Sequence, residues 1–335
     1  MYLGAMSCEI NIGGKYTIRG LETLEVKKSV HTLVNTAKIT LPLSYVIRNN
    51  DISESVKLID KIKEGDSIKI AIGYNGNNKN VFKGFIKRIN NKQPLELELE
   101  DDLYLFNKLE LKKSFPNNDV KDVLQYLVDE CYNQFGKRIK LFDNIPKQQL
   151  TNFLIKDVNG LTVLKELEKW GLHSFLIDVK GEQVLYCGLL YGNKNNTVKY
   201  IINKNTISVD DLKFTNAADK SYKVTFIYND QQGKVHRKYF GDKLGVVLEK
   251  VELDGKFTDA EIERMAKAKM DAAKTSGYKG SFETFIVPSV AIGDIAALQD
   301  LQFPNRSANY YVAAVTTKFG VGGGRNKIEI DFKVA

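Results

Sequence analysis

Residues 65–89 read GDSIKIAIGYNGNNKNVFKGFIKRI, and residues 293–317 read GDIAALQDLQFPNRSANYYVAAVTT. Both stretches open with a Gly-Asp pair, continue into a strand pattern, cross a polar loop and return through a strand led by an aromatic residue. An ungapped alignment places Ile86 on Ala314. Glycine adopts backbone conformations that other residues resist, and aspartate binds amides of its own turn. We therefore predict a duplicated β unit, with equivalent turns at Gly65-Asp66 and Gly293-Asp294.

The first copy lies within a region of strand patterns. Apolar and polar residues alternate in AKITL at 37–41, IKIAI at 68–72 and LELELE at 95–100. This period of two is typical of strands with one face in a core. Residues 53–62 between them predict a short helix. We expect residues 1–106 to form a small β-barrel.

The pattern then changes to helical spacing. Apolar residues recur every three or four positions over residues 120–135, with Asn118 or Asp119 as the N-cap and Gly136 as the stop. This region predicts an amphipathic helix.

A second helix and a hairpin complete the middle of the chain. Residues 160–170 predict the helix, and residues 175–189 predict the hairpin. We therefore expect residues 107–205 to form an α+β lobe inserted between two β regions. Inserted units lie at exposed loops of the parent fold, so the lobe is predicted to be peripheral.

Strand patterns return in the last third of the chain. One helix interrupts them, beginning at a capping box of Thr258 and Glu261 and ending before Gly277. We expect residues 206–335 to form a second β-barrel with one long helix. The predicted fold is mainly β, with two similar small β-barrels flanking a helix-containing lobe. The strand patterns of this part cover residues 222–228, 282–288, 295–298, 310–319 and 328–334.

Composition excludes several classes of protein. The net charge of +8 and pI near 9.0 arise from lysines that alternate with acids, without an Arg-rich block. We therefore expect a solvated basic surface and no specific nucleic-acid partner. No apolar run approaches the length of a membrane span, so stable membrane insertion is not expected. Cys8, Cys131 and Cys187 are odd in number and far apart, which predicts neither a disulfide framework nor a metal knuckle.

Motifs of catalysis are also missing from the sequence. His31, His173 and His236 lie far from other ligand residues, and neither G-x-S-x-G nor H-E-x-x-H occurs. The glycine run at 320–324 lacks the Lys-Ser/Thr of a phosphate loop. The adjacent acids Asp101-Asp102 are of a residue type that glycosidases use, but their separation is not readable from sequence. We expect no catalytic, cofactor-binding or metal-binding residues.

The order of β region, α+β lobe and second β region resembles the late control protein D family of phage baseplate hubs, which includes the hub portion of VgrG proteins in type VI secretion. Four stretches carry the resemblance: TAKITLP at 36–42; Gly65-Asp66 followed by VFKGFI at 81–86; KTSGYKGSF at 274–282 with Pro288 and Gly293-Asp294; and Tyr311-Val312.

The resemblance implies a homotrimer, made in the bacterial cytoplasm and assembled into a tail or injection machine. Its six β units would form a ring that joins a hexameric tail tube to a trimeric spike, among other baseplate proteins. Because the sequence ends at Ala335 soon after the second β region, a separate spike protein is implied. No catalytic residues carry over. Two alternatives stay open: a basic β-barrel that binds oligonucleotide or glycan, and a peptidoglycan-cleaving enzyme.

Overall fold

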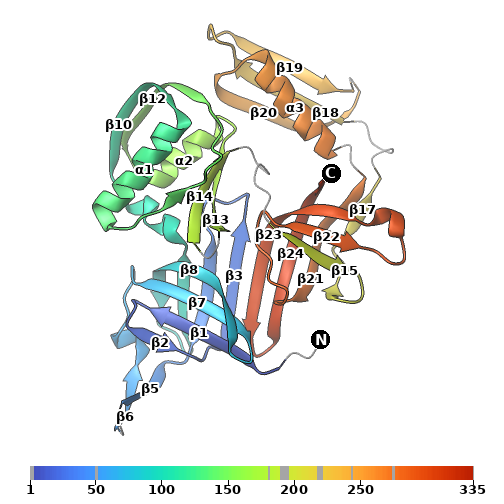
Figure 1. The fold of residues 1–335 in the computed structure, drawn as a ribbon. Helices are drawn as coiled ribbons and strands as arrows, with labels where there is room; N and C mark the ends of the chain where they lie inside the picture. The colour runs from blue at the N-terminus through green and yellow to red at the C-terminus, as the bar shows by residue number, and fades with distance from the viewer. Residues whose placement is uncertain are drawn as a thin grey trace.

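The computed structural model describes residues 4–49, 52–179, 182–188, 196–216, 222–242, 244–273 and 276–334. Strands dominate it, which confirms the prediction of a mainly β protein with a helix-containing lobe (Figure 1). Within these ranges, no helix is both long enough and apolar enough to cross a bilayer.

The first β region follows the predicted alternation. The alternate leucines of LELELE are buried and the glutamates between them face outward, so this strand has one apolar face. Its strands are β1 (Met6–Ile12), β2 (Tyr16–Ile18), β3 (Thr23–Ser29), β4 (Thr36–Leu41), β7 (Ser67–Tyr74), β8 (Asn77–Asn90) and β9 (Leu95–Glu100).

The helix predicted over residues 53–62 is wrong. Residues Ile52–Lys57 form strand β6, which pairs with β5 (Ser44–Asn49), and only the short 3₁₀ helix η1 (Leu58–Asp60) follows. Backbone pairing across this hairpin overrides the weak local helix signal.

The second β region contains the second Gly-Asp turn. Its strands are β15 (Thr197–Ile201), β16 (Thr206–Ser208), β17 (Lys213–Thr215), β21 (Gly277–Phe285), β22 (Ile295–Gln299), β23 (Ala308–Gly320) and β24 (Gly323–Val334).

The two β regions are joined edge to edge rather than separate. They share one 14-stranded sheet with the main path β16-β21-β24-β23-β3-β4-β9-β8-β7-β1-β2. The link is an antiparallel pairing of β3 with β23, from Ser29 opposite Ala314 to Thr23 opposite Gly320. Each region has an edge strand with unpaired amides and carbonyls, and joining the two edges satisfies them.

The lobe has its own apolar core and the helices that the sequence predicts. Helix α1 (Val120–Phe135) begins at a capping box, in which Asp119 accepts from the Lys121 amide at 2.9 Å, and it stops at Gly136 with φ of 69°. The other elements are β10 (Leu111–Asp119), β11 (Lys140–Leu141), β12 (Gln149–Val158), α2 (Gly160–Glu168), β13 (His173–Val179) and β14 (Glu182–Gly188).

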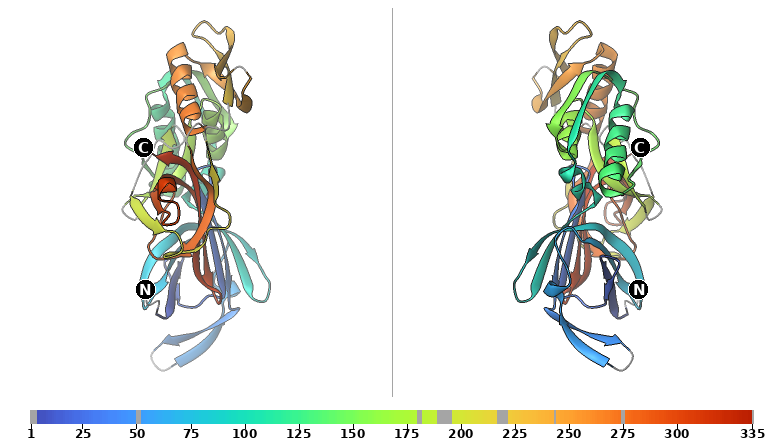
Figure 2. Two further views of the ribbon diagram at one scale, coloured as in Figure 1. Left: turned by 90° about the vertical axis from the view of Figure 1, so that its right-hand side faces the viewer. Right: turned by 90° about the vertical axis from the view of Figure 1, so that its left-hand side faces the viewer.

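A small unit with an apolar core of its own is inserted before β21. Strands β18 (Tyr222–Asn229), β19 (Val235–Gly241) and β20 (Val246–Lys256) form a sheet covered by α3 (Asp259–Ala273). The predicted capping box is confirmed, because the Glu261 carboxylate accepts from the Thr258 amide at 2.8 Å. Trp170 of the lobe packs on Phe257, with 6.4 Å between ring centroids. Figure 2 shows this unit and the lobe at one end of the molecule and the β5–β6 hairpin at the other.

A buried carboxyl lies where the first β region meets the lobe. Asp101 is fully buried and accepts from the amides of Asn35, at 2.8 Å, and Leu103, at 3.0 Å. Burial raises the pKa of Asp101 to about 7, and the neighbouring charge of Asp102 adds to the rise.

This raised pKa predicts a pH dependence of stability. A carboxyl whose folded pKa lies above its unfolded pKa contributes stability that is complete below the unfolded value and is lost as the pH rises through the folded value. Between about pH 5 and about pH 8, we expect the unfolding free energy of the wild type, relative to Asp101→Asn, to fall by about 2 kcal/mol. Urea titrations of both proteins at the two pH values measure this difference. A pH-independent difference would refute it.

Candidate assembly interface

The two Gly-Asp turns are built by the same hydrogen bonds. In the first turn, the Gly65 amide donates to the Ile86 carbonyl at 2.8 Å, and the Ile86 amide donates to the Asp66 carbonyl at 2.9 Å. In the second, the Gly293 amide donates to the Val312 carbonyl at 3.0 Å, and the Val312 amide returns a bond to the Asp294 carbonyl at 2.9 Å.

The glycines and aspartates of both turns have matching roles. Gly65 and Gly293 have positive φ values of 89° and 83°. The Asp66 carboxylate accepts from the amide three residues earlier at 2.9 Å, and the Asp294 carboxylate does the same at 2.8 Å. The two turns therefore have the same local geometry.

The hydrogen bonds also correct the alignment of the returning strand. They equate Ile86 with Val312, whereas the ungapped alignment placed Ile86 on Ala314. The second copy is thus two residues shorter between the turn and its returning strand. Both returning strands then have a bulge at the same place, after Ile86 in β8 and after Val312 in β23. A shift of two keeps every side chain on its face of the sheet, so the sequence pattern did not reveal it.

The equivalence extends through four strands. Ile86 pairs with Leu99 and Val312 with Ile330, and these partners pair in turn with Ala37 on β4 and Gly280 on β21. One strand further, Lys27 on β3 corresponds in the same way to Lys213 on β17. The path β8-β9-β4-β3 in the first copy therefore corresponds to β23-β24-β21-β17 in the second, with β16 continuing the edge that β17 forms.

Within one chain, the edge of β3 is occupied by β23 of the other copy. Ser29, Lys28 and Lys27 lie opposite Ala314, Val315 and Thr316. The pairing continues past β3, because the Val30 amide donates to the Ala313 carbonyl at 3.0 Å. At this junction a strand of the second β region pairs with the edge of a strand of the first.

The corresponding edges, those of β16 and β17 and the part of β8 beyond its pairing with β7, have no partner strand among the described residues. Strands β16 and β17 pair only with β21, on one side. Beyond Phe85, the segment Arg88–Asn90 of β8 pairs only with β9. A sheet edge of this kind is a template for another strand.

An exposed aromatic patch lies beside the β17 edge. The Arg306 guanidinium lies over the rings of Phe214, at 4.7 Å, and Phe303, at 4.0 Å. Phe303 is 46% exposed and Leu301 is 50% exposed, although Asp300 holds their loop in place. Aromatic residues with arginine are enriched in protein interfaces.

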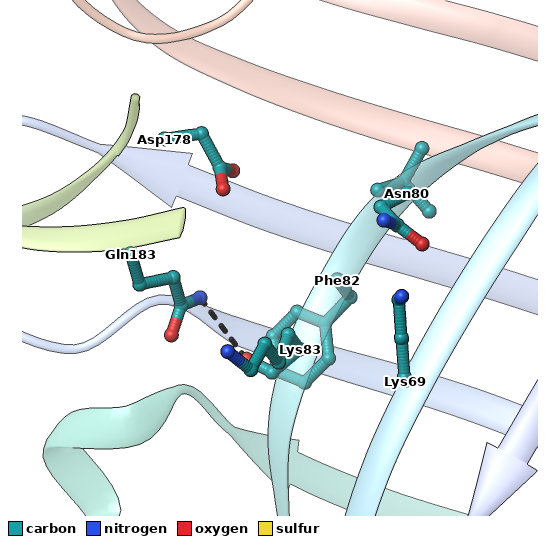
Figure 3. Close-up of a pocket in the computed structure, with 7 residues that line it drawn as sticks. Lys69, Asn80, Phe82, Lys83, Asp178 and Gln183 are labelled. Atoms are coloured by element: carbon teal, nitrogen blue, oxygen red, sulfur yellow. Dashed lines mark hydrogen bonds between the residues drawn. The ribbon is translucent and has the colours of Figure 1, made fainter. Parts of the chain in front are cut away.

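The cavity in Figure 3 lies between β8 and the β13–β14 hairpin. Its volume is about 80 Å³, and Gln183 closes it by donating to the Lys83 carbonyl at 3.1 Å. This volume fits a few waters and no drug-sized ligand. The cavity is therefore part of the packing between the lobe and the first β region. Its lining residues are Lys69, Asn80, Val81, Phe82, Lys83, Asp178 and Gln183.

The histidines are dispersed. His31, His173 and His236 each lie near one carboxylate, at 3.9, 3.5 and 2.7 Å. Across the described ranges, no three His, Cys, Asp or Glu side chains are grouped to hold a metal ion, and the three cysteines are buried and unbridged. Asp101 and Asp102 are also buried rather than placed in a cleft.

Comparison with known proteins gives structural matches without sequence matches. No family model and no curated protein matches the sequence. A tail protein from Neisseria meningitidis has a TM-score of 0.66 at 13% identity, over 98% of this chain and 96% of its own. The 43 kDa tail protein of prophage MuSo2 from Shewanella oneidensis has a TM-score of 0.64 at 13% identity, over 97% and 98%.

Secretion proteins share the same architecture. An Escherichia coli component of the type VI secretion system has a TM-score of 0.60 at 10% identity, over 97% of this chain and 79% of its own. A chain of the Francisella PdpA-VgrG complex has a TM-score of 0.58 at 13% identity, over 98% and 58%. The chain therefore has the fold of these tail and secretion proteins.

Proposed function

We propose that the protein is a structural baseplate hub of a contractile phage tail or a related injection system. One observation carries the proposal: two β regions with matching turns are joined by pairing of β3 with β23, and the corresponding edges at β17 and at Arg88–Asn90 of β8 have no partner strand among the described residues. Three chains that repeat the internal junction between them form a closed ring of six similar β units.

In the proposed ring, the junction between chains has the register of the internal junction. Lys28 lies opposite Val315, and their equivalents are Phe214 on β17 and Ile89 on β8. By the same correspondence, the proposed junction pairs Thr215 of one chain with Arg88 of the next, as Ser29 pairs with Ala314 inside the chain. The patch of Phe214, Phe303 and Arg306 adjoins this contact and supplies its apolar area.

The number of chains follows from the partners that such a ring joins. A hexameric tube needs six similar surfaces, and a trimeric spike needs three; two repeats in each of three chains provide both. Tail tube protein, a separate spike protein and other baseplate proteins are the proposed partners. The division into residues 1–106, 107–205 and 206–335 is proposed with the lobe outside the ring, except that β15 at the end of the middle range belongs with the second β region, where it pairs with β22.

The charged face of the shared sheet is proposed to line the central channel. It carries both signs: Lys38 pairs with Glu96 at 2.8 Å, and Glu25 pairs with Lys27 at 2.7 Å and Lys318 at 3.6 Å. A face of balanced charge gives a polyanion no electrostatic gain. This observation favours the hub over an oligonucleotide-binding module.

Disulfide trapping tests the ring. We expect the double variant Arg88→Cys, Thr215→Cys to form covalent species on oxidation that end at three chains, because the native cysteines are buried. Non-reducing electrophoresis and light scattering measure the products. The matched control Ala314→Cys, Ser29→Cys places the corresponding pair inside one chain, so after oxidation it is expected to run as a single chain in denaturing, non-reducing electrophoresis. Absence of trapping between chains, with a formed control bridge, would refute the ring.

A non-enzymatic role is part of the proposal. We expect the pure protein to have no cell-wall hydrolase activity and to bind no stoichiometric zinc, because its histidines, cysteines and paired acids are dispersed or buried. Turbidity of a peptidoglycan suspension and elemental analysis measure the two properties. Lysis or one zinc per chain would support the enzyme alternative instead.

A further inference from the structure

The unpaired edge of β8 is covered by a carboxylate. The Ile89 amide donates to Oε1 of Glu64 at 3.1 Å. Glu64 directly precedes the first Gly-Asp turn, which is fixed against β8 because the Gly65 amide donates to the Ile86 carbonyl at 2.8 Å. The turn therefore delivers the carboxylate to the edge at a defined place.

In the second β region the corresponding edge, that of β23, is paired with a strand. Val315, the equivalent of Ile89, lies opposite Lys28 of β3. Ile292, the equivalent of Glu64, is buried in the apolar core of the second β region. The apolar Ile292 thus precedes the turn beside the paired edge of β23. The exposed Glu64 precedes the turn beside the unpaired edge of β8.

We infer that Glu64 guards this edge: its carboxylate holds the Ile89 amide in the single chain and leaves when β17 of a second copy pairs there. The inference rests on the proposed ring. In the register of the internal junction, the incoming strand presents the backbone of Phe214 to Ile89, so Glu64 Oε1 stands in for a carbonyl oxygen of that strand.

Replacing the Glu64 carboxylate by a backbone carbonyl of β17 costs free energy, and this cost controls assembly. A hydrogen bond to a charged acceptor is stronger than one to a neutral carbonyl, and charged residues at sheet edges oppose unwanted pairing. The Glu64 carboxylate therefore slows the pairing of any strand with this edge. Only a strand whose binding also buries the patch around Phe303 and Arg306 gains enough to offset the lost Glu64–Ile89 hydrogen bond. Glu64 therefore selects the β17 edge over other exposed strands.

Removal of the guard is the test. In the Arg88→Cys, Thr215→Cys background, we expect Glu64→Ala to raise the rate of trapping between chains by about 3- to 10-fold. Glu64→Gln keeps an acceptor oxygen without the charge, and its rate is expected to lie between those of the parent and the alanine variant. The control Asp60→Ala removes an exposed carboxylate from the same region and is expected to leave the rate unchanged.

Hydrogen exchange at Ile89 separates this inference from the ring itself. In dilute single chains without the added cysteines, Glu64→Ala is expected to speed exchange of the Ile89 amide by several-fold, with no change in Asp60→Ala. Faster exchange with an unchanged trapping rate would overturn the guard and leave the edge pairing intact. Failure of all variants to trap between chains would refute the ring and the guard together.

Discussion

Alanine at Gly84 is expected to destabilise the protein by about 3 kcal/mol or more. A Cβ at Gly84 would lie 2.0 Å from the Glu100 carbonyl oxygen and 2.7 Å from the Asp101 Cα. Both neighbours are backbone atoms of the chain as it leaves β9, so the clash is relieved only by moving the strand pair. A glycine in a strand commonly marks such a close approach of another backbone.

Urea denaturation followed by far-ultraviolet circular dichroism measures the loss. The matched control is Gly20→Ala, because a Cβ at Gly20 meets no heavy atom within 4 Å. Its unfolding free energy is expected to stay within about 0.5 kcal/mol of the wild type. Equal midpoints for Gly84→Ala and Gly20→Ala would show that β8 and β9 separate without cost.

The sequence predicted the elements better than their connections. Periodicity and capping residues predicted α1 and its Gly136 stop correctly and narrowed the N-cap to Asn118 or Asp119, of which the structure has Asp119, because these signals lie within a few residues of one another. The repeated Gly-Asp turns were also visible locally. The pairing of β3 with β23 was not, since Ser29 and Ala314 are nearly 300 residues apart and edge partners leave no periodic signal.

The same limit explains what sequence reasoning missed in the candidate interface. Phe214, Arg306 and Phe303 are separated in the chain and form a patch only through the fold. Glu64 carried a signal that was available: it precedes the Gly-Asp turn in the first copy, whereas Ile292 precedes it in the second. A charged residue at one position and an apolar residue at the corresponding position indicate that only the second position is buried by neighbouring chain.

The two aspartates of the repeated turns are expected to contribute unequally to stability. Asp294 is buried, and its carboxylate accepts from the Ala291 amide at 2.8 Å and the Asn196 amide at 3.1 Å. Asp66 is half-buried and accepts from the Lys63 amide alone, at 2.9 Å. Asp294→Ala removes the buried acceptor of two amides, at about 1–3 kcal/mol for each group left unsatisfied.

We therefore expect Asp294→Ala to lower the unfolding free energy by about 2–4 kcal/mol and Asp66→Ala by about 1 kcal/mol. The two variants are matched, because they make the same substitution at corresponding positions of two turns with the same hydrogen bonds. The Asn196 amide also directs the start of β15, whose pairing with β22 begins at Thr197 opposite Ile295. Hydrogen exchange should thus accelerate along β15 in Asp294→Ala and not in Asp66→Ala. Equal losses of unfolding free energy in the two variants would contradict this expectation. They would show that the hydrogen bond from Asn196 and the burial of Asp294 add no stability to the second turn.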